Sequence, residues 1–278
     1  QGNPFKYGFI GDTDSHNAAA SNEEFNYTGK FAFETNPAHR LEGVPGQPPG
    51  QVQQVREFSS GGLAGVWAEE NTREAIFDAM VRKETFGTSG THLKVRLFGG
   101  WNFTAADDQN TDWVAAGYAR GVPMGGNLVA AEKPVAPSFI VWALKDPESG
   151  NLDRIQIVKG WVDSVGGQHE AIYDVAWSEG REPDAKTGKL PPVGNTVDIA
   201  AATYTNDIGA AELFTVWSDP DFDASLYAFY YARVLEIPTP RWSTIDATRL
   251  GIEIPPGLAP SIQERAWSSP IWYTPSRM

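Results

Sequence analysis

The sequence contains no cysteine among its 278 residues, which excludes disulfide bonds, thiolate metal sites and cysteine nucleophiles. Basic residues are also scarce, because 22 Lys and Arg stand against 35 Asp and Glu and give a formal net charge of −13. Nucleic-acid binding depends on basic side chains that neutralise phosphates, so this balance argues against a nucleic-acid partner. An anionic small substrate is still compatible with it, since a bound metal ion can reverse the local field.

Long apolar runs are missing as well, and so are several familiar phosphate-binding and catalytic motifs. The longest uninterrupted apolar stretches fall well short of the roughly 18 residues that a membrane-spanning helix requires, so we expect no membrane span. There is no GxxxxGK[ST] loop, GxSxG elbow or HExxH pair, and we expect no nucleotide cofactor. The chain opens without Met, a basic n-region or an apolar h-region, which favours a part of a longer polypeptide over a chain whose signal was removed.

The first 90 residues hold one clear helix signal and one irregular stretch. The pattern predicts a helix over 71–84, with Asn71 as N-cap and Glu74 reaching back in a capping box. Its apolar side chains share one face, namely Ile76, Phe77, Met80 and Val81. Residues 36–57 hold four Pro and three Gly with little periodicity, which predicts a long loop.

After Gly90 the pattern changes to short strands separated by Gly, Pro and Asp. Leu93, Val95 and Leu97 alternate with basic residues, as in a half-buried strand. Further strands are predicted at 138–144, 152–161, 170–177, 211–217, 228–237 and 269–273. Six or seven short strands with turns between them predict an antiparallel β-sandwich over residues 91–278.

The polar cluster Asp12-Thr13-Asp14-Ser15-His16-Asn17 follows a short apolar run at 6–11, which predicts a buried strand that ends in a polar loop. A carboxylate and an imidazole one residue apart project to the same side of an extended segment. They can bind one metal ion or serve two neighbouring ions. The alternative is a hydrogen-bonded Asx-turn with His16 simply exposed.

The segment KYGFIGDTDSHNAA (6–19) resembles the last metal-binding motif of the PHP (polymerase and histidinol phosphatase) superfamily, whose members use a distorted β/α barrel that holds two or three metals. Five further segments resemble a large bacterial family of uncharacterised proteins within that superfamily. They are GGLAGVWAEENTREAIFDAMVRKETFGTSG (61–90), NLDRIQIVKGWVD (151–163), KLPPVGNTVD (189–198), FYYARVLEIPTPRW (229–242) and QERAWSSPIWYTP (263–275).

The resemblance implies a fold of class α/β plus β, in which residues 1–90 are the C-terminal part of a β/α barrel and 91–278 are the β-sandwich. It also implies an H-x-H motif on the first barrel strand, yet the four histidines here stand alone. The chain therefore resembles the C-terminal half of such a protein, and we expect the N-terminal half to be physically associated.

The resemblance places metal ligands at Asp14 and His16, and Asp12 and Asn17 are candidates to support them. Position and charge suggest Lys30, His39 and Arg40, beside Asn17, as binders of substrate oxyanions. The metals implied are manganese or zinc, with two ions expected.

Some relatives resemble dimetal arylsulfatases, so the implied activity is hydrolysis of sulfate esters, or less favourably of phosphate esters. The resemblance also favours a periplasmic or secreted location. The alternative is a non-enzymatic β-sandwich module that binds carbohydrate or a protein partner through exposed Trp and Tyr, although aromatic residues at strand spacing are more often core.

Overall fold

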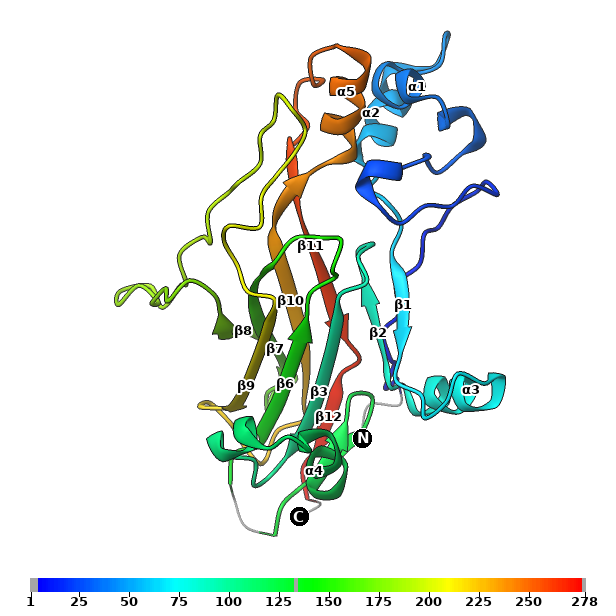
Figure 1. Cartoon of the computed structure of the whole chain (residues 1–278). Coiled ribbons are helices and arrows are strands. Elements are labelled where there is room, and N and C mark those ends of the chain that lie inside the picture. The colour runs from blue at the N-terminus through cyan, green and yellow to red at the C-terminus, as the bar shows by residue number, and fades with distance from the viewer. Residues whose placement is uncertain (1–4, 133–134, 277–278) are drawn as a thin grey trace.

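The strands form two sheets that face each other (Figure 1). Along the strands, side chains that point into the core alternate with side chains that point outward. The computed structural model describes residues 5–132 and 135–276. In β10, the longest strand, side chains alternate between buried and half-buried over most of its length, as the period of two in a strand requires. The fold is mixed α/β, and its sheets have an arrangement compatible with the predicted β-sandwich.

The larger sheet has the order β1-β2-β11-β10-β12-β5, with β7 also paired to β10 and β8 paired to β7. All its pairs are antiparallel except β12 with β5. Its strands are β1 (Leu63–Val66), β2 (Thr85–Thr88), β5 (Asn127–Val129), β7 (Leu152–Val162), β8 (Gln168–Trp177), β10 (Ala228–Pro240), β11 (Ser261–Ser268) and β12 (Ile271–Thr274).

The smaller sheet is fully antiparallel and has the order β4-β3-β6-β9. Its strands are β3 (Lys94–Gly100), β4 (Gly121–Pro123), β6 (Ser138–Leu144) and β9 (Glu212–Ser218). The main core draws side chains from both sheets, including Leu97 and Phe139 of the smaller sheet and Ile157 and Tyr230 of the larger one. These four side chains have no exposed surface.

Short helices lie at both ends of the sheets (Figure 1). The α-helices are α1 (Pro37–Glu42), α2 (Pro49–Glu57), α3 (Arg73–Arg82), α4 (Trp113–Arg120) and α5 (Trp242–Leu250), and 3₁₀ turns occur at η1 (Glu24–Asn26), η2 (Ala32–Glu34) and η3 (Ala105–Gln109). Among residues 5–132 and 135–276, no helix combines the length and apolar character needed to cross a membrane.

Helices α1, α2 and α5 gather at one end and form what we call the helical cap (Figure 1). Leu41 and Trp242 are fully buried in a small cluster there. Arg40 of α1 and Asp246 of α5 form a buried ion pair, with Nη2 and Oδ2 2.6 Å apart. Because neither charge is exposed to water, the pair fixes α1 against α5.

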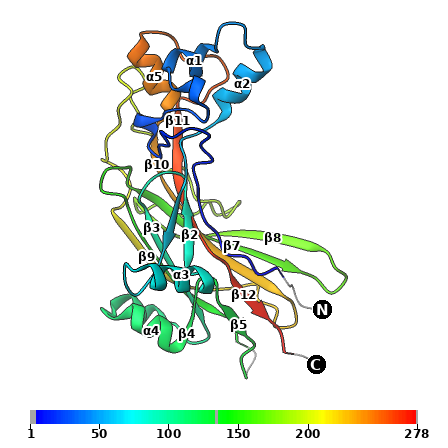
Figure 2. The same ribbon diagram turned by 90° about the vertical axis from the view of Figure 1, so that its right-hand side faces the viewer.

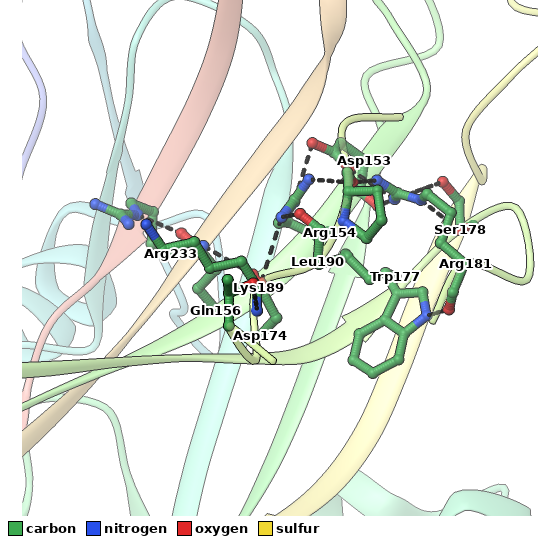
Figure 3. A network of polar contacts seen from close by, with 12 residues as sticks. Asp153, Arg154, Gln156, Asp174, Trp177, Ser178, Arg181, Lys189, Leu190 and Arg233 are labelled. Atoms are coloured by element: carbon green, nitrogen blue, oxygen red, sulfur yellow. Dashed lines mark hydrogen bonds and ion pairs between the residues drawn. The ribbon is translucent and has the colours of Figure 1, made fainter. Parts of the chain in front are cut away.

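The long segment between β8 and β9 is held to the larger sheet by an arginine network (Figure 3). Arg181 Nη2 donates to Asp153 Oδ1 over 2.7 Å, and Arg181 Nη1 donates to the carbonyl of Pro191 over 2.9 Å. Arg154 Nη2 reaches the same carbonyl over 3.1 Å. Figure 2 shows the β7–β8 hairpin extending away from the rest of the molecule.

Most of the predicted strands after residue 91 are confirmed, whereas the first 90 residues differ from expectation. A portion of a β/α barrel was predicted there, but no barrel is found among the described residues. Instead β1 and β2 pair with each other and join the larger sheet through β11. The division into domains at 1–90 and 91–278 stays a prediction.

Three local predictions are corrected. Residues 36–57 hold two helices rather than a loop, because Pro37 and Pro49 occupy first-turn positions, where a missing N–H costs nothing. Residues 6–11 form no strand and are partly exposed. The predicted helix over 71–84 is confirmed as α3, but its N-cap bond comes from Thr72, and of its residues only Ala79 is buried.

Candidate functional site

The path of the chain into the Asp12–Asn17 loop depends on a close approach at Gly11. A Cβ atom at Gly11 would lie 2.5 Å from the carbonyl oxygen of Leu63 and 2.8 Å from that of Thr88. Directly afterwards, the N–H of Gly62 donates to the carbonyl of Asp12 over 2.9 Å. The loop therefore begins where the chain packs against the ends of β1 and β2.

The other side of the loop is held by the Gly29–Lys30 turn. The N–H of His16 donates to the carbonyl of Lys30 over 2.7 Å. Asn17 Nδ2 donates to the carbonyls of Gly29 and Lys30 over 3.2 and 3.3 Å. Asn17 thus positions the loop through its amide, and its predicted role in supporting the metal ligands stays a prediction.

Asp14, His16 and Lys30 are brought together by this arrangement. Asp14 has a φ of 49°, in the left-handed region that non-glycine residues seldom adopt. Its Oδ2 accepts a very short hydrogen bond from Lys30 Nζ, and its Oδ1 lies 3.8 Å from His16 Nε2. The Asp14 side chain is 73% exposed and that of His16 is 52% exposed, so both stay accessible to a ligand.

Lys30 stabilises the negative charge of Asp14. The hydrogen bond from Lys30 and its positive charge hold the pKa of the Asp14 carboxyl below its usual value, with a smaller contribution from His16. Lys30 therefore stabilises the ionised form of the Asp14 carboxyl and occupies Oδ2, while Oδ1 faces His16. The neighbouring Asp12 uses Oδ1 to accept the N–H of Thr13 over 2.7 Å.

A cavity of about 400 Å³ opens beside these groups, and Asp12, Asp14 and Lys30 line it. Tyr27 and Ser60 line it as well, and their side chains are 7% and 5% exposed. Neither hydroxyl oxygen has a hydrogen-bond partner among the described residues. Burial, followed by the charge of Glu34, raises the pKa of Tyr27, so its hydroxyl stays protonated and can donate to an anion.

His39 and Arg40 are not brought to this cavity. His39 Nδ1 lies 3.0 Å from the carbonyl of Phe33. The guanidinium of Arg40 is buried in its ion pair with Asp246, and it also donates to the carbonyl of Glu34 over 2.8 Å. Of the cations suggested by the sequence, Lys30 is the one that lines the cavity with Asp14.

The donors present fit part of a metal site. Two ligands of one tetrahedral zinc ion lie about 3.3 Å apart, close to the observed distance between Asp14 Oδ1 and His16 Nε2. Carboxylate and imidazole suit manganese, iron or zinc. Across the part of the chain that the structure describes, however, no three His, Cys, Asp or Glu residues form a group that could hold a metal ion.

Sequence reasoning missed Tyr27 and Ser60. Both lie outside the DTDSHN motif, and neither residue type marks a site when it stands alone. Only the fold brings these hydroxyls to the same cavity and leaves them without partners. Their importance could not be read from spacing.

A comparison with protein families places the chain beside a known family. The model of a family described as protein of unknown function (DUF3604) matches residues 1–275. No curated protein and no solved structure matches the chain. The match covers both the Asp12–Asn17 loop and the two sheets.

Proposed function

The chain belongs to the DUF3604 family, and from this premise we propose that it is the C-terminal part of a metal-dependent hydrolase of sulfate esters. The proposal also rests on the resemblance of residues 6–19 to a metal-binding motif of the PHP superfamily. The observation that carries it is the convergence of the Asp14 carboxylate, the Lys30 ammonium group and two hydroxyls without partners among the described residues at one cavity, with the His16 imidazole beside the carboxylate.

In this proposal Asp14 and His16 hold the metal. Their donor atoms face each other across 3.8 Å, and both side chains are exposed. A divalent manganese or zinc ion, when bound, would polarise an ester oxygen and activate a water molecule. Asn17 keeps the loop in position, and Asp12 supports the turn before the ligands.

The remaining cavity groups bind the acid end of the substrate. Lys30 provides a positive charge, and Tyr27 and Ser60 provide neutral donors for ester oxygens. A sulfate monoester carries one negative charge at neutral pH, whereas a phosphate monoester approaches two, since its second pKa is about 6. One ammonium group with two hydroxyls therefore favours the sulfate ester.

The proposal includes an associated N-terminal half that supplies the other metal ligands through the H-x-H motif implied by the resemblance. Exposed apolar side chains on the first 90 residues support such a contact. On α3, Phe77 and Val81 are each 63% exposed, and Tyr7 and Ile10 in the first segment are 65% and 60% exposed. Exposed apolar side chains of this kind are available for contact with another chain.

Metal content and turnover of the full gene product test the proposal. We expect about two transition-metal ions per protein and hydrolysis of 4-nitrophenyl sulfate in preference to 4-nitrophenyl phosphate. His16→Ala should lose bound metal and reduce kcat/KM by at least about 100-fold, because the removal of even a supporting group costs 10 to 100-fold. Lys30→Gln should keep the metal and raise KM for the sulfate ester.

His169→Ala is the matched control, because His169 is similarly exposed at 44% and lies on the β7–β8 hairpin. It should leave metal content and turnover unchanged. Full metal occupancy and full activity in His16→Ala would overturn the proposal.

The alternative function, a carbohydrate-binding module, is favoured by an aromatic cavity of about 550 Å³ on the larger sheet. Trp161, Tyr227, Phe229, Trp272 and Tyr273 are among the residues that line it. The indole N–H of Trp272 is buried and has no hydrogen-bond partner among the described residues. Aromatic faces with a free donor are suited to stacking and hydrogen bonding with a sugar ring.

The two functions differ in their need for metal. Neutral and sulfated oligosaccharides should be titrated into the chain with EDTA present, beside a Trp161→Ala variant. Tight binding that resists EDTA and is lost in Trp161→Ala would support the module. Binding that requires metal and depends on His16 would support the hydrolase.

A further inference from the structure

A second cavity, of about 340 Å³, lies where the ends of β10 and β11 meet η1, residues 90–92 and residues 202–204. It shares no lining residue with the cavity at Asp14. Its volume falls within the range of small-molecule sites, which begins near 300 Å³. Nothing in the proposed hydrolase accounts for it.

The lining of this cavity is strongly acidic. Five carboxylates line it, namely Glu23, Glu24, Asp146, Glu148 and Glu264, and no Lys or Arg does so within the described part of the chain. His92 is the one lining side chain in that part that can become positively charged. A ligand with positive charge is therefore favoured over a neutral or anionic one.

Glu264 lies deepest among these carboxylates, with only 3% of its surface exposed. Its Oε2 accepts a very short hydrogen bond from Ser89 Oγ, while no protein donor reaches Oε1 within the described residues. Burial, followed by the charge of Glu24, raises the pKa of Glu264 to about 8. A buried acid with one unpartnered oxygen at a cavity wall is an incomplete hydrogen-bonding arrangement.

Two other buried carboxylates, Asp219 and Asp246, have cationic partners, whereas the buried Glu34 and Glu236 form no ion pair with a described residue. Asp219 lies 2.6 Å from Lys159 Nζ, and Asp246 lies 2.6 Å from Arg40 Nη2. None of the ion pairs between described residues includes Glu264. Glu264 therefore either holds a proton or takes a cation from a ligand.

The walls of the cavity indicate an organic cation rather than a bare metal ion. No three His, Cys, Asp or Glu residues in the described chain form a metal-holding group. Phe25 and Tyr204 line the cavity together with Pro240 and Ile245. Aromatic faces attract organic ammonium ions, and apolar walls favour a carbon skeleton.

We propose that this cavity binds a small organic ammonium ion, with the ammonium group against Glu264 Oε1 and the carbon part against Phe25 and Tyr204. An ammonium group has three donors and no acceptor, so it supplies the hydrogen bond that Oε1 lacks. The bond is charge-assisted, because the ligand keeps Glu264 ionised. The aromatic walls then contribute packing that is independent of the charge.

Benzylamine is the test ligand, and benzyl alcohol is its neutral counterpart of nearly equal size. Calorimetric titration of the 278-residue chain should show that benzylamine binds roughly tenfold or more tightly than benzyl alcohol. Glu264→Gln keeps the shape and an acceptor for Ser89 but removes the charge. It should lower the affinity for benzylamine by about tenfold and leave that for benzyl alcohol unchanged.

Two further variants keep the test decisive if Glu264→Gln fails to fold. Phe25→Ala, at an exposed wall position, should weaken benzylamine binding several-fold without loss of folding. Glu170→Gln, in the aromatic cavity, should have no effect. Equal affinity for the amine and the alcohol, no binding of either, or unchanged benzylamine affinity in Glu264→Gln would overturn the proposal, as would displacement of benzylamine by micromolar calcium.

Discussion

Side chains in the first 90 residues and side chains between the two sheets differ in how far they are buried and hydrogen-bonded. Between the sheets, Phe139 and Tyr230 are fully buried, and the ring centroids lie 4.6 Å apart. On α3, by contrast, Phe77 faces away from the rest of the described chain and is 63% exposed. The same contrast holds for polar groups, because Tyr230 OH donates to Asp219 over 2.7 Å while Tyr27 OH finds no partner within residues 5–132 and 135–276.

This difference in burial and pairing indicates which residues stabilise the fold and which are available for binding. Groups that are paired and buried hold the sheets together, and they have little capacity left for a ligand. Exposed groups contribute little to folding, and polar atoms without a partner keep their hydrogen-bonding capacity for a substrate, a cation or another chain. The following predictions test where the boundary between these two kinds of residue lies.

The largest expected effect comes from two phenylalanines in opposite environments. Phe139→Ala should lower the free energy of unfolding by about 3–5 kcal/mol, because it leaves a cavity between the sheets. Phe77→Ala should change it by less than about 0.5 kcal/mol, since its ring is exposed. Urea denaturation followed by tryptophan fluorescence measures both, and an equal loss in the two variants would break the comparison.

A pH effect is expected from the unpaired acids of the larger sheet. Burial raises the pKa of Glu264 to about 8 and that of Glu236 to about 7, both above the ordinary 4.5. The folded protein therefore holds these protons more tightly, so the free energy of unfolding should fall as pH rises from about 4.5 to 8. The slope reaches up to about 1.4 kcal/mol per pH unit for each group.

Glu264→Gln should flatten this dependence, and Glu170→Gln should not. Denaturation of the three proteins at half-unit steps between pH 5 and pH 8.5 gives the slopes. A Glu264→Gln slope as steep as that of the parent chain would show that Glu264 is ionised in the folded protein throughout this range.

A moderate effect is expected at the entry to the Asp12–Asn17 loop. Gly11→Ala should cost about 1–3 kcal/mol, because the added Cβ meets the carbonyls of Leu63 and Thr88. Gly50→Ala is the control, since a Cβ there meets nothing within 4 Å, and alanine favours the helix by up to about 1 kcal/mol. Thermal unfolding measures both, and an unchanged melting temperature in Gly11→Ala would contradict the close approach.

The smallest expected change in the free energy of unfolding concerns the N-cap of α3, which the sequence predicts at Asn71 and the structure places at Thr72. Thr72→Ala should cost about 1 kcal/mol, because its side chain accepts the N–H of Ala75 over 3.3 Å. Asn71→Ala should be nearly neutral, since its side chain makes no cap bond. The free energy of unfolding of the two variants decides which residue begins the helix.

Much of the sheet structure could be predicted from local pattern. The predicted strand over 138–144 coincides with β6, and β10 begins at the predicted residue 228. Alternation fixes such strands because it is a property of neighbouring residues. In contrast, β2 has the sequence Thr-Phe-Gly-Thr and is wholly buried, and only its pairing with β1 and β11 makes it a strand.

The candidate site was predictable in its motif and unpredictable in its surroundings. The Asp14-x-His16 spacing indicated two convergent donors, and the structure places Lys30 beside them. Arg40 had equal promise as an anion binder on charge alone, but Asp246, 206 positions later, pairs with it. Partners this distant in the sequence leave no local signal, so burial and pairing had to come from the fold.

One strand links the parts compared above. β10 runs from the main core to the helical cap, and Pro240 at its end is separated from α5 by a single residue (Figure 1). At about 3.3 Å per residue its 13 residues extend for roughly 43 Å, and β7 flanks its first part while β11 flanks its second. Neighbouring strands hold β10 along its length, and its last residue leads into the helical cap. Tilting the cap would therefore require bending a hydrogen-bonded strand. We therefore expect the backbone amides at the cap end of β10 to exchange as slowly as those in the middle of the sheets.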